Sequence, residues 1–220
     1  MRIEELTADD IRQLGAFCDT ALITFGGASW RPPHLPIGTS WFILRRLRDI
    51  LEGSLGGRMI TLPVQGINIE GESDTLFPIP KSAAISMFSH QLQELVDRLS
   101  IRYLVFLTDS LEAEDAFKIA FEQIPAKEQL SSLSFIWWRD GIETIQKHTF
   151  SKSGELETSL LMAIAKRLVD LEQKSATRHA AIQATEQAGQ QYWTYMEGAL
   201  LENVQSMWIK ASSVHASPPN

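Results

Sequence analysis

The chain of 220 residues is poor in cysteine and in positive charge, and it has no long hydrophobic run. Its single cysteine, Cys18, cannot form a disulfide within the chain, and it leaves no thiolate cluster for a structural zinc. Lys and Arg number 20 against 27 Asp and Glu, and this net charge of −7 disfavours non-specific nucleic-acid binding. No apolar stretch approaches the ~20 residues that cross a bilayer, and the acidic start lacks the apolar core of a signal peptide. We therefore expect a cytoplasmic protein that binds neither nucleic acid nor membrane.

What the sequence does contain is a regular alternation of short apolar runs and longer amphipathic stretches. Apolar runs that suit strands covered on both faces occur at residues 21–25, 59–64, 103–107 and 133–138. Stripes of apolar residues at helical spacing occur at residues 41–51, 85–99, 113–124 and 160–171. This order of elements predicts a three-layer α/β/α domain with a mostly parallel central sheet.

The last long segment, residues 180–210, has an apolar stripe that predicts one helix of about eight turns. Two partners for this stripe remain open: the helix packs on its own sheet, or it meets another subunit. A helix of this length would extend past strands of ~17–20 Å, so we expect its distal end, at Met207 and Trp208, to pack on a second chain. Residues 1–211 are predicted to form a single domain, and residues 212–220 a flexible tail.

Four segments resemble signature segments of one known family. Residues 26–40 read GGASWRPPHLPIGTS and resemble the GSxEQHGPHLPLGTD of the creatininase (creatinine amidohydrolase) family. Residues 154–159, GELETS, resemble its later GEIETS. Two shorter matches are GINIE at residues 66–70, followed by Phe77-Pro78, and ATEQAG at residues 184–189. The matches follow the family's order across residues 20–190, and the resemblance implies a creatininase-like α/β/α fold.

Members of that family are metal-dependent hydrolases of linear or cyclic amide bonds. The resemblance implies two divalent ions held by Glu, His, Asp, a second His and a late Glu, because these groups bind zinc or manganese and the metals deprotonate the attacking water. In this chain the five positions carry Ser29, Arg31, Ser40, Ser110 and Glu157, so only Glu157 keeps a ligand-type side chain. Histidines of two further family segments are replaced by Gly71 and Lys152. We therefore expect no metal and no other cofactor.

Arg31 determines the charge of the expected pocket. A fixed cation opposes the binding of two dications by Coulomb repulsion, whereas pairing with Glu157 compensates the missing metal charge. We therefore expect the two side chains to lie close together. Sites in open α/β sheets lie at the carboxyl ends of the strands. The predicted ligand pocket there comprises Ser29, Arg31, His34, Ser40, Glu70, Ser110 and Glu157.

His34 is the one candidate catalytic residue. It could act as a general base, or it could be a packed, hydrogen-bonded imidazole. A third alternative is a triad of His34 and an acid with Ser29, Ser40 or Ser110, although no G-x-S-x-G elbow accompanies these serines.

Acidic residues cluster after the second and the third predicted strand. They could supply oxygen ligands for a hard cation such as magnesium. Alternatively, they could be solvated acids of loops and helix starts, where negative charge stabilises the first turn. The two clusters are Glu70, Glu72 and Asp74, and Asp109, Glu112, Glu114 and Asp115.

Two functions follow from these features. The first is a creatininase-like protein without its metal centre, acting as a non-catalytic partner or scaffold subunit or as a small-molecule binding protein. The second is a divergent amidohydrolase that cleaves amide or cyclic amide C–N bonds at a remodelled site, with zinc or manganese. The loss of several ligand positions at once favours the first. Because family members commonly form hexamers, the resemblance also implies a homo-oligomer, or a hetero-oligomer with an active creatininase-family subunit.

Overall fold

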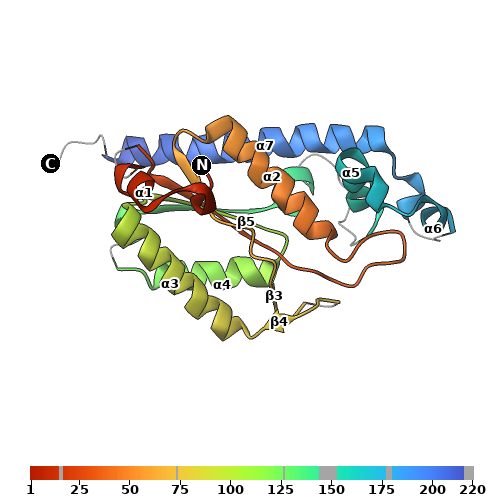
Figure 1. The fold of residues 1–220 in the computed structure, drawn as a ribbon, viewed down its shortest axis with the longest axis horizontal. Helices are drawn as coiled ribbons and strands as arrows, with labels where there is room; N and C mark the ends of the chain where they lie inside the picture. Colours follow the sequence, from red (N-terminus) through yellow and green to blue (C-terminus); the bar gives the residue numbers. More distant parts are fainter. Residues whose placement is uncertain (15–16, 73, 126, 144–152, 177–179, 216–220) are drawn as a thin grey trace.

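A computed structural model describes residues 1–14, 17–72, 74–125, 127–143, 153–176 and 180–215 of the chain (Figure 1). Its centre is a four-stranded parallel sheet in the order β2-β1-β5-β6. The strands are β1 (Thr20–Phe25), β2 (Met59–Thr61), β5 (Tyr103–Thr108) and β6 (Ser131–Ile136). Each strand overlaps one of the four apolar runs, although β6 begins and ends two residues earlier than its run, and the predicted parallel sheet is confirmed.

Helices cover both faces of this sheet (Figure 1). On one face lie α2 (Thr39–Leu55) and the long α7 (Glu186–His215), with α5 (Glu155–Ala165) packed against α7. On the other face lie α3 (Lys81–Leu99) and α4 (Leu111–Glu122), which pack against each other. The three layers confirm the predicted α/β/α architecture. Among the described residues, no helix is both long and apolar enough to cross a membrane.

Shorter elements join these layers. The remaining helical turns are η1 (Ile3–Glu5), α1 (Ala8–Leu14), η2 (Lys127–Gln129), the π-helical η3 (Arg139–Glu143), η4 (Lys166–Leu168), α6 (Leu171–Ala176) and η5 (Ala180–Gln183). A second, two-stranded parallel sheet pairs β3 (Asn68–Ile69) with β4 (Pro78–Ile79). The predicted helix over residues 160–171 is wrong in its extent, because α5 ends at Ala165 and η4 breaks the stripe.

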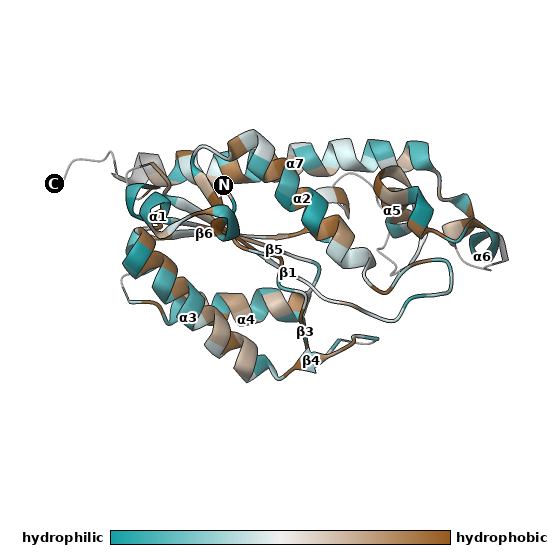
Figure 2. Cartoon of the chain, viewed as in Figure 1, coloured by the Kyte–Doolittle hydropathy of each residue, from teal (hydrophilic) through white to brown (hydrophobic). Residues whose placement is uncertain are grey.

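The two faces of the sheet have separate cores because successive strand residues point to opposite sides. In β5, Leu104 and Phe106 pack with α3 and α4, whereas Val105 and Leu107 pack with α2 and α7. On the α3–α4 side, the rings of Phe106 and Phe117 stack with centroids 4.3 Å apart. Figure 2 shows hydrophobic residues on the strands and on the helix sides that face them. Burial on both faces explains why β1, β2 and β5 read as continuous apolar runs.

Helix α7 runs antiparallel to the strands, from their carboxyl ends to their amino ends (Figure 1). Near its start, Gly189 approaches α5 so closely that a Cβ atom would overlap the carbonyl of Ser159. Near its end, the indole N–H of Trp208 donates to Thr20 Oγ1 at the start of β1, at 3.0 Å. The helix begins at Glu186, later than predicted, and it ends at His215.

The apolar stripe of α7 belongs to the core of its own chain. Met207 is 8% exposed, and Trp208 packs against the α2–α7 core and lies under the guanidinium of Arg58, 4.5 Å from its ring centroid. The expectation that Met207 and Trp208 overhang the domain is therefore wrong, and the expected contact with a second chain stays a prediction. The helix is longer than a strand, but it lies lengthwise along the sheet. Its aromatic end is therefore covered by its own chain. The predicted single domain, residues 1–211, remains a prediction; in the predicted tail, residues 216–220 lie outside the described residues.

Candidate functional site

The carboxyl ends of the strands carry most of the predicted site. The segment of residues 26–38 leaves β1, extends past this end of the sheet and turns back into α2, while α5 lies at the same end (Figure 1). Its first residues need glycine, because a Cβ at Gly26 would lie 2.6 Å from Asp109 Oδ1 and would overlap Leu44. Tight packing against β5 and α2 thus directs the segment toward α5.

Arg31 and Glu157 form the centre of this region. Nη1 of Arg31 lies 3.0 Å from Oε2 of Glu157, and each side chain is only 1% exposed. Nη2 of Arg31 donates to Ser40 Oγ at 2.8 Å. The predicted contact between Arg31 and Glu157 is confirmed, and it joins segments separated by 126 positions in the chain. Burial strengthens this pair, because water does not screen its attraction.

The position of Glu157 in α5 adds to the stabilisation of its negative charge. It is the third residue of the helix, after the N-cap Gly154. The backbone N–H of Ser153 also donates to its Oε2. A carboxylate in the first turn interacts favourably with the positive end of the helix dipole and satisfies N–H groups that have no helical partner. The charge of Glu157 is therefore compensated by the protein itself.

His34 lies beside the same helix turn, and its side chain is fully buried. Nε2 lies 3.1 Å from Thr158 Oγ1, and that hydroxyl donates to the carbonyl of Gly154 at 2.8 Å. Because the threonine has a single hydroxyl proton, His34 Nε2 is the donor in the first contact. This geometry supports the packed, hydrogen-bonded imidazole, whose N–H fixes the segment of residues 26–38 to α5.

The other predicted pocket residues are placed differently. Ser29 is buried, and its backbone N–H donates to Ile37 O at 3.0 Å. Ser110 caps α4, with its Oγ accepting from Ala113 N at 2.9 Å. Glu70 is exposed and donates its backbone N–H to Ile79 in the small β3–β4 sheet. Of the seven predicted residues, the structure thus directly joins Arg31, Ser40 and Glu157, with His34 bonded to the residue next to Glu157.

Two positions of the family resemblance complete this account. Gly71 has a left-handed φ of 111°, a conformation that favours glycine over histidine. Lys152 lies outside the described residues.

Glu112, Glu114 and Asp115, which follow β5, have basic partners. Lys81 Nζ contacts Glu112 at 2.8 Å and Asp115 at 2.7 Å. Glu114 is buried and accepts two hydrogen bonds of 3.0 Å from Arg139. The hydrogen bonds from Arg139 lower the pKa of Glu114 below its usual value, although burial opposes this shift. These contacts favour helix-start acids over a magnesium site.

Arg139 is a charged residue of this end that the sequence pattern does not single out. It follows β6 and also binds Asp140, whose Oδ2 accepts from the backbone N–H of Ile136 at 2.7 Å. One feature of the sequence could have identified Arg139. The charged pair Arg139-Asp140 directly follows an apolar run, at the carboxyl end of a predicted strand.

The donor set at this end does not fit two divalent ions. In the described parts of the chain, no three His, Cys, Asp or Glu side chains converge to hold a metal. Glu157 already binds a guanidinium, Ser40 accepts from the same guanidinium, and Ser110 caps a helix. Hydroxyls are poor zinc or manganese ligands beside carboxylate and imidazole.

Comparison with known proteins relates the whole domain to one family. Residues 4–210 match the family described as Creatininase: Creatinine amidohydrolase. No curated protein sequence gives a significant match.

Solved structures agree over nearly the whole chain. A crystal structure of creatinine amidohydrolase (creatininase) has a TM-score of 0.76 at 15% identity, covering 94% of this chain and 97% of that chain. A manganese creatininase has a TM-score of 0.74 at 15% identity, covering 93% and 97%. A putative creatinine amidohydrolase from Bacteroides fragilis NCTC 9343 has a TM-score of 0.70 at 14% identity, covering 94% and 96%. At such low identity these structures establish the fold alone. Because the family match spans residues 4–210, the chain belongs to the creatininase family.

Proposed function

We propose that this chain is a non-catalytic creatininase-family protein that serves as a partner or scaffold subunit, or binds a small molecule, without a metal centre. The observation that supports this proposal is the buried ion pair between Arg31 and Glu157. It holds the one retained ligand-type carboxylate in a contact with a permanent cation.

Electrostatics disfavours a dication beside Arg31, because the carboxylate of Glu157 is already paired with the guanidinium. Two unit charges 4 Å apart interact by about 4 kcal/mol at an effective dielectric constant of 20, so a dication near the guanidinium would be repelled by about 8 kcal/mol. A metal would therefore have to displace Arg31 from Glu157 and Ser40.

The same pair also links two segments of the fold. The ion pair and the hydrogen bond between His34 and Thr158 connect the segment after β1 to α5. In a metal-binding relative, ligands from both segments would be connected through the metals. In this chain a guanidinium supplies that cross-link, which favours a retained fold without hydrolytic chemistry.

Metal content and hydrolysis of the purified protein test the proposal. After incubation with excess zinc or manganese and gel filtration, we expect well under one bound equivalent per chain. We also expect no chelator-sensitive hydrolysis of creatinine or of linear amides. About two tightly bound equivalents, or chelator-sensitive turnover, would instead support the divergent amidohydrolase.

A ligand graft tests whether the frame still accepts metal. The variant combines Ser29→Glu, Arg31→His, Ser40→Asp and Ser110→His, and we expect it to bind zinc or manganese more tightly than the native chain. The matched control carries Arg31→Met alone, which removes the cation but adds no ligand. Because Ser110→His removes a helix cap worth about 1 kcal/mol, the variant's folding is checked by circular dichroism first. Equal metal affinity of graft and control would show that the frame has lost the ligand geometry.

A further inference from the structure

Strand β6 forms one edge of the central sheet. Its sequence is Ser-Ser-Leu-Ser-Phe-Ile, with no charged residue and no proline. Exposed sheet edges in monomeric proteins are usually protected by charges, prolines or bulges, because an unprotected edge pairs readily with another strand. The sequence of this edge therefore lacks the residues that discourage pairing.

The register of β6 shows which backbone groups point outward. In a parallel pair, the N–H and C=O of one residue point to the same neighbour, and successive residues alternate. The N–H of Ser131 donates to Arg102 O at 2.9 Å, so Ser131, Leu133 and Phe135 face β5. Ser132 and Ser134 consequently direct their backbone groups away from the sheet.

Ile136, the last residue of the strand, differs from Ser132 and Ser134 in the hydrogen bonding of its outward backbone N–H. The outward N–H of Ile136 donates to Asp140 Oδ2 at 2.7 Å. Within the described part of the chain, no hydrogen bond involves the outward backbone groups of Ser132 or Ser134. Two residues thus offer two donors and two acceptors along one open edge.

A hollow of about 410 Å³ lies beside this edge. It is lined by Ser132 and Leu133 from β6 and by Asn203, Ser206 and Met207 from α7. Because α7 runs antiparallel to the strands, the hollow opens between a strand and a helix of opposite direction. The edge is therefore accessible where its backbone groups point outward.

We propose that β6 pairs antiparallel with β6 of a second copy of this chain, about a twofold axis at Leu133. Ser132 of each copy then exchanges two hydrogen bonds with Ser134 of the other. The pairing gives four new hydrogen bonds and joins two four-stranded sheets into one. The edge fits a second copy because this donor and acceptor pattern is complementary to itself under twofold symmetry.

The charges of α7 fit the same axis. Ser206 lines the hollow together with Leu133, and Glu202 and Lys210, both exposed, lie four residues on either side of Ser206 in α7. A twofold axis between the two β6 strands would place both α7 helices on the same face of the joined sheet, running antiparallel. This arrangement brings Glu202 of each copy toward Lys210 of the other. Strand and helix thus indicate the same symmetric contact, independently of any catalytic loss.

Disulfide cross-linking of the full chain tests the strand register. The Ser132→Cys/Ser134→Cys variant should form a covalent dimer under mild oxidation, because hydrogen-bonded antiparallel pairs have Cα atoms ~5.5 Å apart, within disulfide range. Each single cysteine variant is the matched control and should not cross-link, since position 132 faces position 134. The native Cys18 is only 4% exposed and should not contribute. Equal cross-linking of single and double variants, or none in any, would overturn the proposal.

Sedimentation equilibrium tests the contact without new cysteines. Ser132→Pro removes one outward N–H and no internal ladder bond, and we expect the dimer to weaken at least about tenfold. Glu202→Lys places like charges together and should weaken it about tenfold, while adding Lys210→Glu should restore it. Both helix positions are exposed, so these variants fold even if the proline variant does not.

Two results in these experiments would overturn the proposal. One is a monomeric native chain at ~100 μM. The other is dimer formation only after residues 216–220 are removed, which would mean that the chain's own end covers the edge.

Discussion

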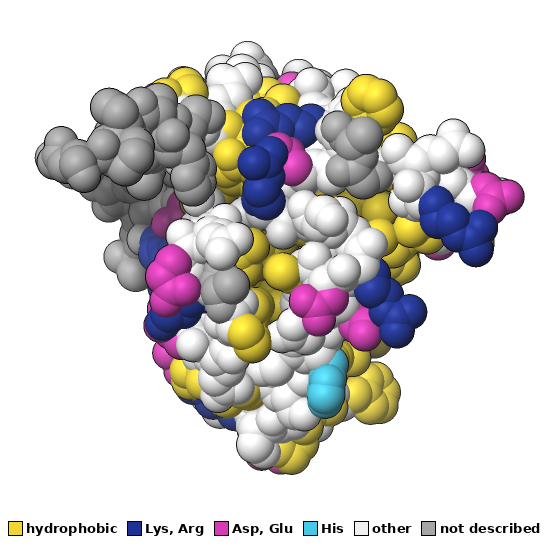
Figure 3. Space-filling model, turned by 90° about the vertical axis from the view of Figure 1, so that its left-hand side faces the viewer, with side chains coloured by type: hydrophobic (Ala, Val, Ile, Leu, Met, Phe, Trp, Pro, Cys, Tyr) yellow, Lys and Arg dark blue, Asp and Glu magenta, His cyan; other side chains and the backbone are white. Residues whose placement is uncertain are grey.

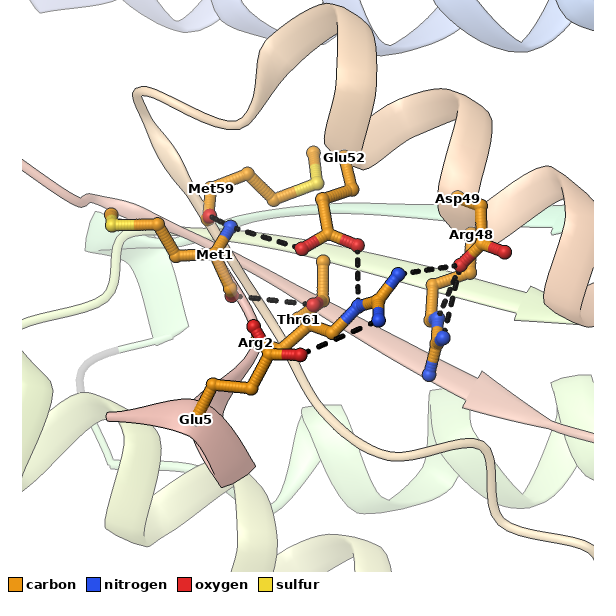
Figure 4. Close-up of polar contacts among 8 residues, drawn as sticks. All are labelled: Met1, Arg2, Glu5, Arg48, Asp49, Glu52, Met59 and Thr61. Carbon is orange, nitrogen blue, oxygen red and sulfur yellow. Dashed lines mark hydrogen bonds and ion pairs between the residues drawn. The ribbon is translucent and has the colours of Figure 1, made fainter. Parts of the chain in front are cut away.

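Two arginine clusters in this protein use the same chemistry in different surroundings. Arg31 and Glu157 are each 1% exposed and lie between the segment after β1 and α5. Arg2 lies at the opposite end of α2, where its Nε contacts Glu52 at 2.9 Å and its Nη2 contacts Asp49 at 3.3 Å (Figure 4). The side chain of Arg2 is 33% exposed, and those of Glu52 and Asp49 are 20% and 33% exposed.

Burial determines what each cluster contributes. Water and salt screen the Arg2 cluster, so its ion pairs add little to stability, and Asp49 is shared with Arg48. The Arg31–Glu157 pair is unscreened, so the loss of one partner leaves an uncompensated buried charge. The number of ion pairs is therefore a poor guide to their contribution to stability. Loss of one partner of the single buried pair should cost more than loss of one partner in the Arg2 cluster.

The largest effect is expected when Glu157 alone is removed. Glu157→Ala leaves the buried Arg31 guanidinium without its carboxylate and should lower the free energy of unfolding by about 3–5 kcal/mol. Urea denaturation followed by tryptophan fluorescence measures this loss. A loss below about 0.5 kcal/mol would show that the pair is not coupled to folding.

The matched control removes both charges at once. Arg31→Met/Glu157→Leu replaces the pair by apolar side chains, which in other buried pairs is close to neutral. We expect this double variant to recover most of the stability that Glu157→Ala loses. If it is as unstable as Glu157→Ala, packing or helix capping rather than the unpaired charge explains the loss.

An intermediate effect is expected at Asp19, which is 17% exposed between two arginines. Burial raises its pKa, but hydrogen bonds from Arg58 and Thr20 and the charges of Arg58 and Arg102 outweigh it and hold the pKa below its usual value. Asp19→Asn should cost about 1 kcal/mol at pH 7. Figure 3 shows this end of the molecule, where basic and acidic side chains lie side by side.

The pH dependence of the Asp19 effect follows from the sign of its shift. A carboxyl group with a lowered pKa stabilises the folded state above its unfolded pKa, about 3.9, and loses that contribution as pH falls through the folded pKa. The stabilities of the native chain and Asp19→Asn should therefore differ from pH 5 to 7 and converge below about pH 4. Urea midpoints across this range measure the difference, and a constant difference would contradict the assignment.

The smallest effect is expected in the Arg2 cluster. Glu52→Gln removes the carboxylate closest to Arg2, and its stability loss should be smaller than that of Asp19→Asn. It should also disappear in 1 M NaCl, where the Debye length is only ~3 Å. The loss caused by Glu157→Ala should persist at that salt concentration. Equal salt sensitivity of the two variants would remove the distinction between the clusters.

Much of the fold could be predicted from the sequence because its signals are local. Three apolar runs became β1, β2 and β5, since strands buried on both faces carry no polar alternation. The fourth run overlaps the edge strand β6, which is buried only at Phe135 and Ile136. The strands β3 and β4, of two residues each, are too short to produce a pattern. The break after Ala165 was also beyond sequence patterning, because the apolar spacing continues through η4 while the backbone does not.

The candidate site could be predicted in part. The contact between Arg31 and Glu157 followed from charge reasoning on two motifs that lie far apart in the chain. The role of Ser110 as the cap of α4 could not be distinguished from a pocket position, since a serine after a strand suits both. The partner of Glu114 could not be identified either, because Arg139 reaches it only through the parallel pairing of β5 and β6.

By itself, the sequence determined the parallel sheet, the long C-terminal helix and the replacement of most family ligand residues, because periodicity and residue identity are properties of short segments. Only the tertiary structure decided what the apolar stripe of α7 packs against, which groups the site serines bind, and that β6 leaves Ser132 and Ser134 at an open edge. These features depend on the order of strands in the sheet and on the direction in which a helix crosses it. Both arise from contacts between distant segments, to which local patterns are insensitive.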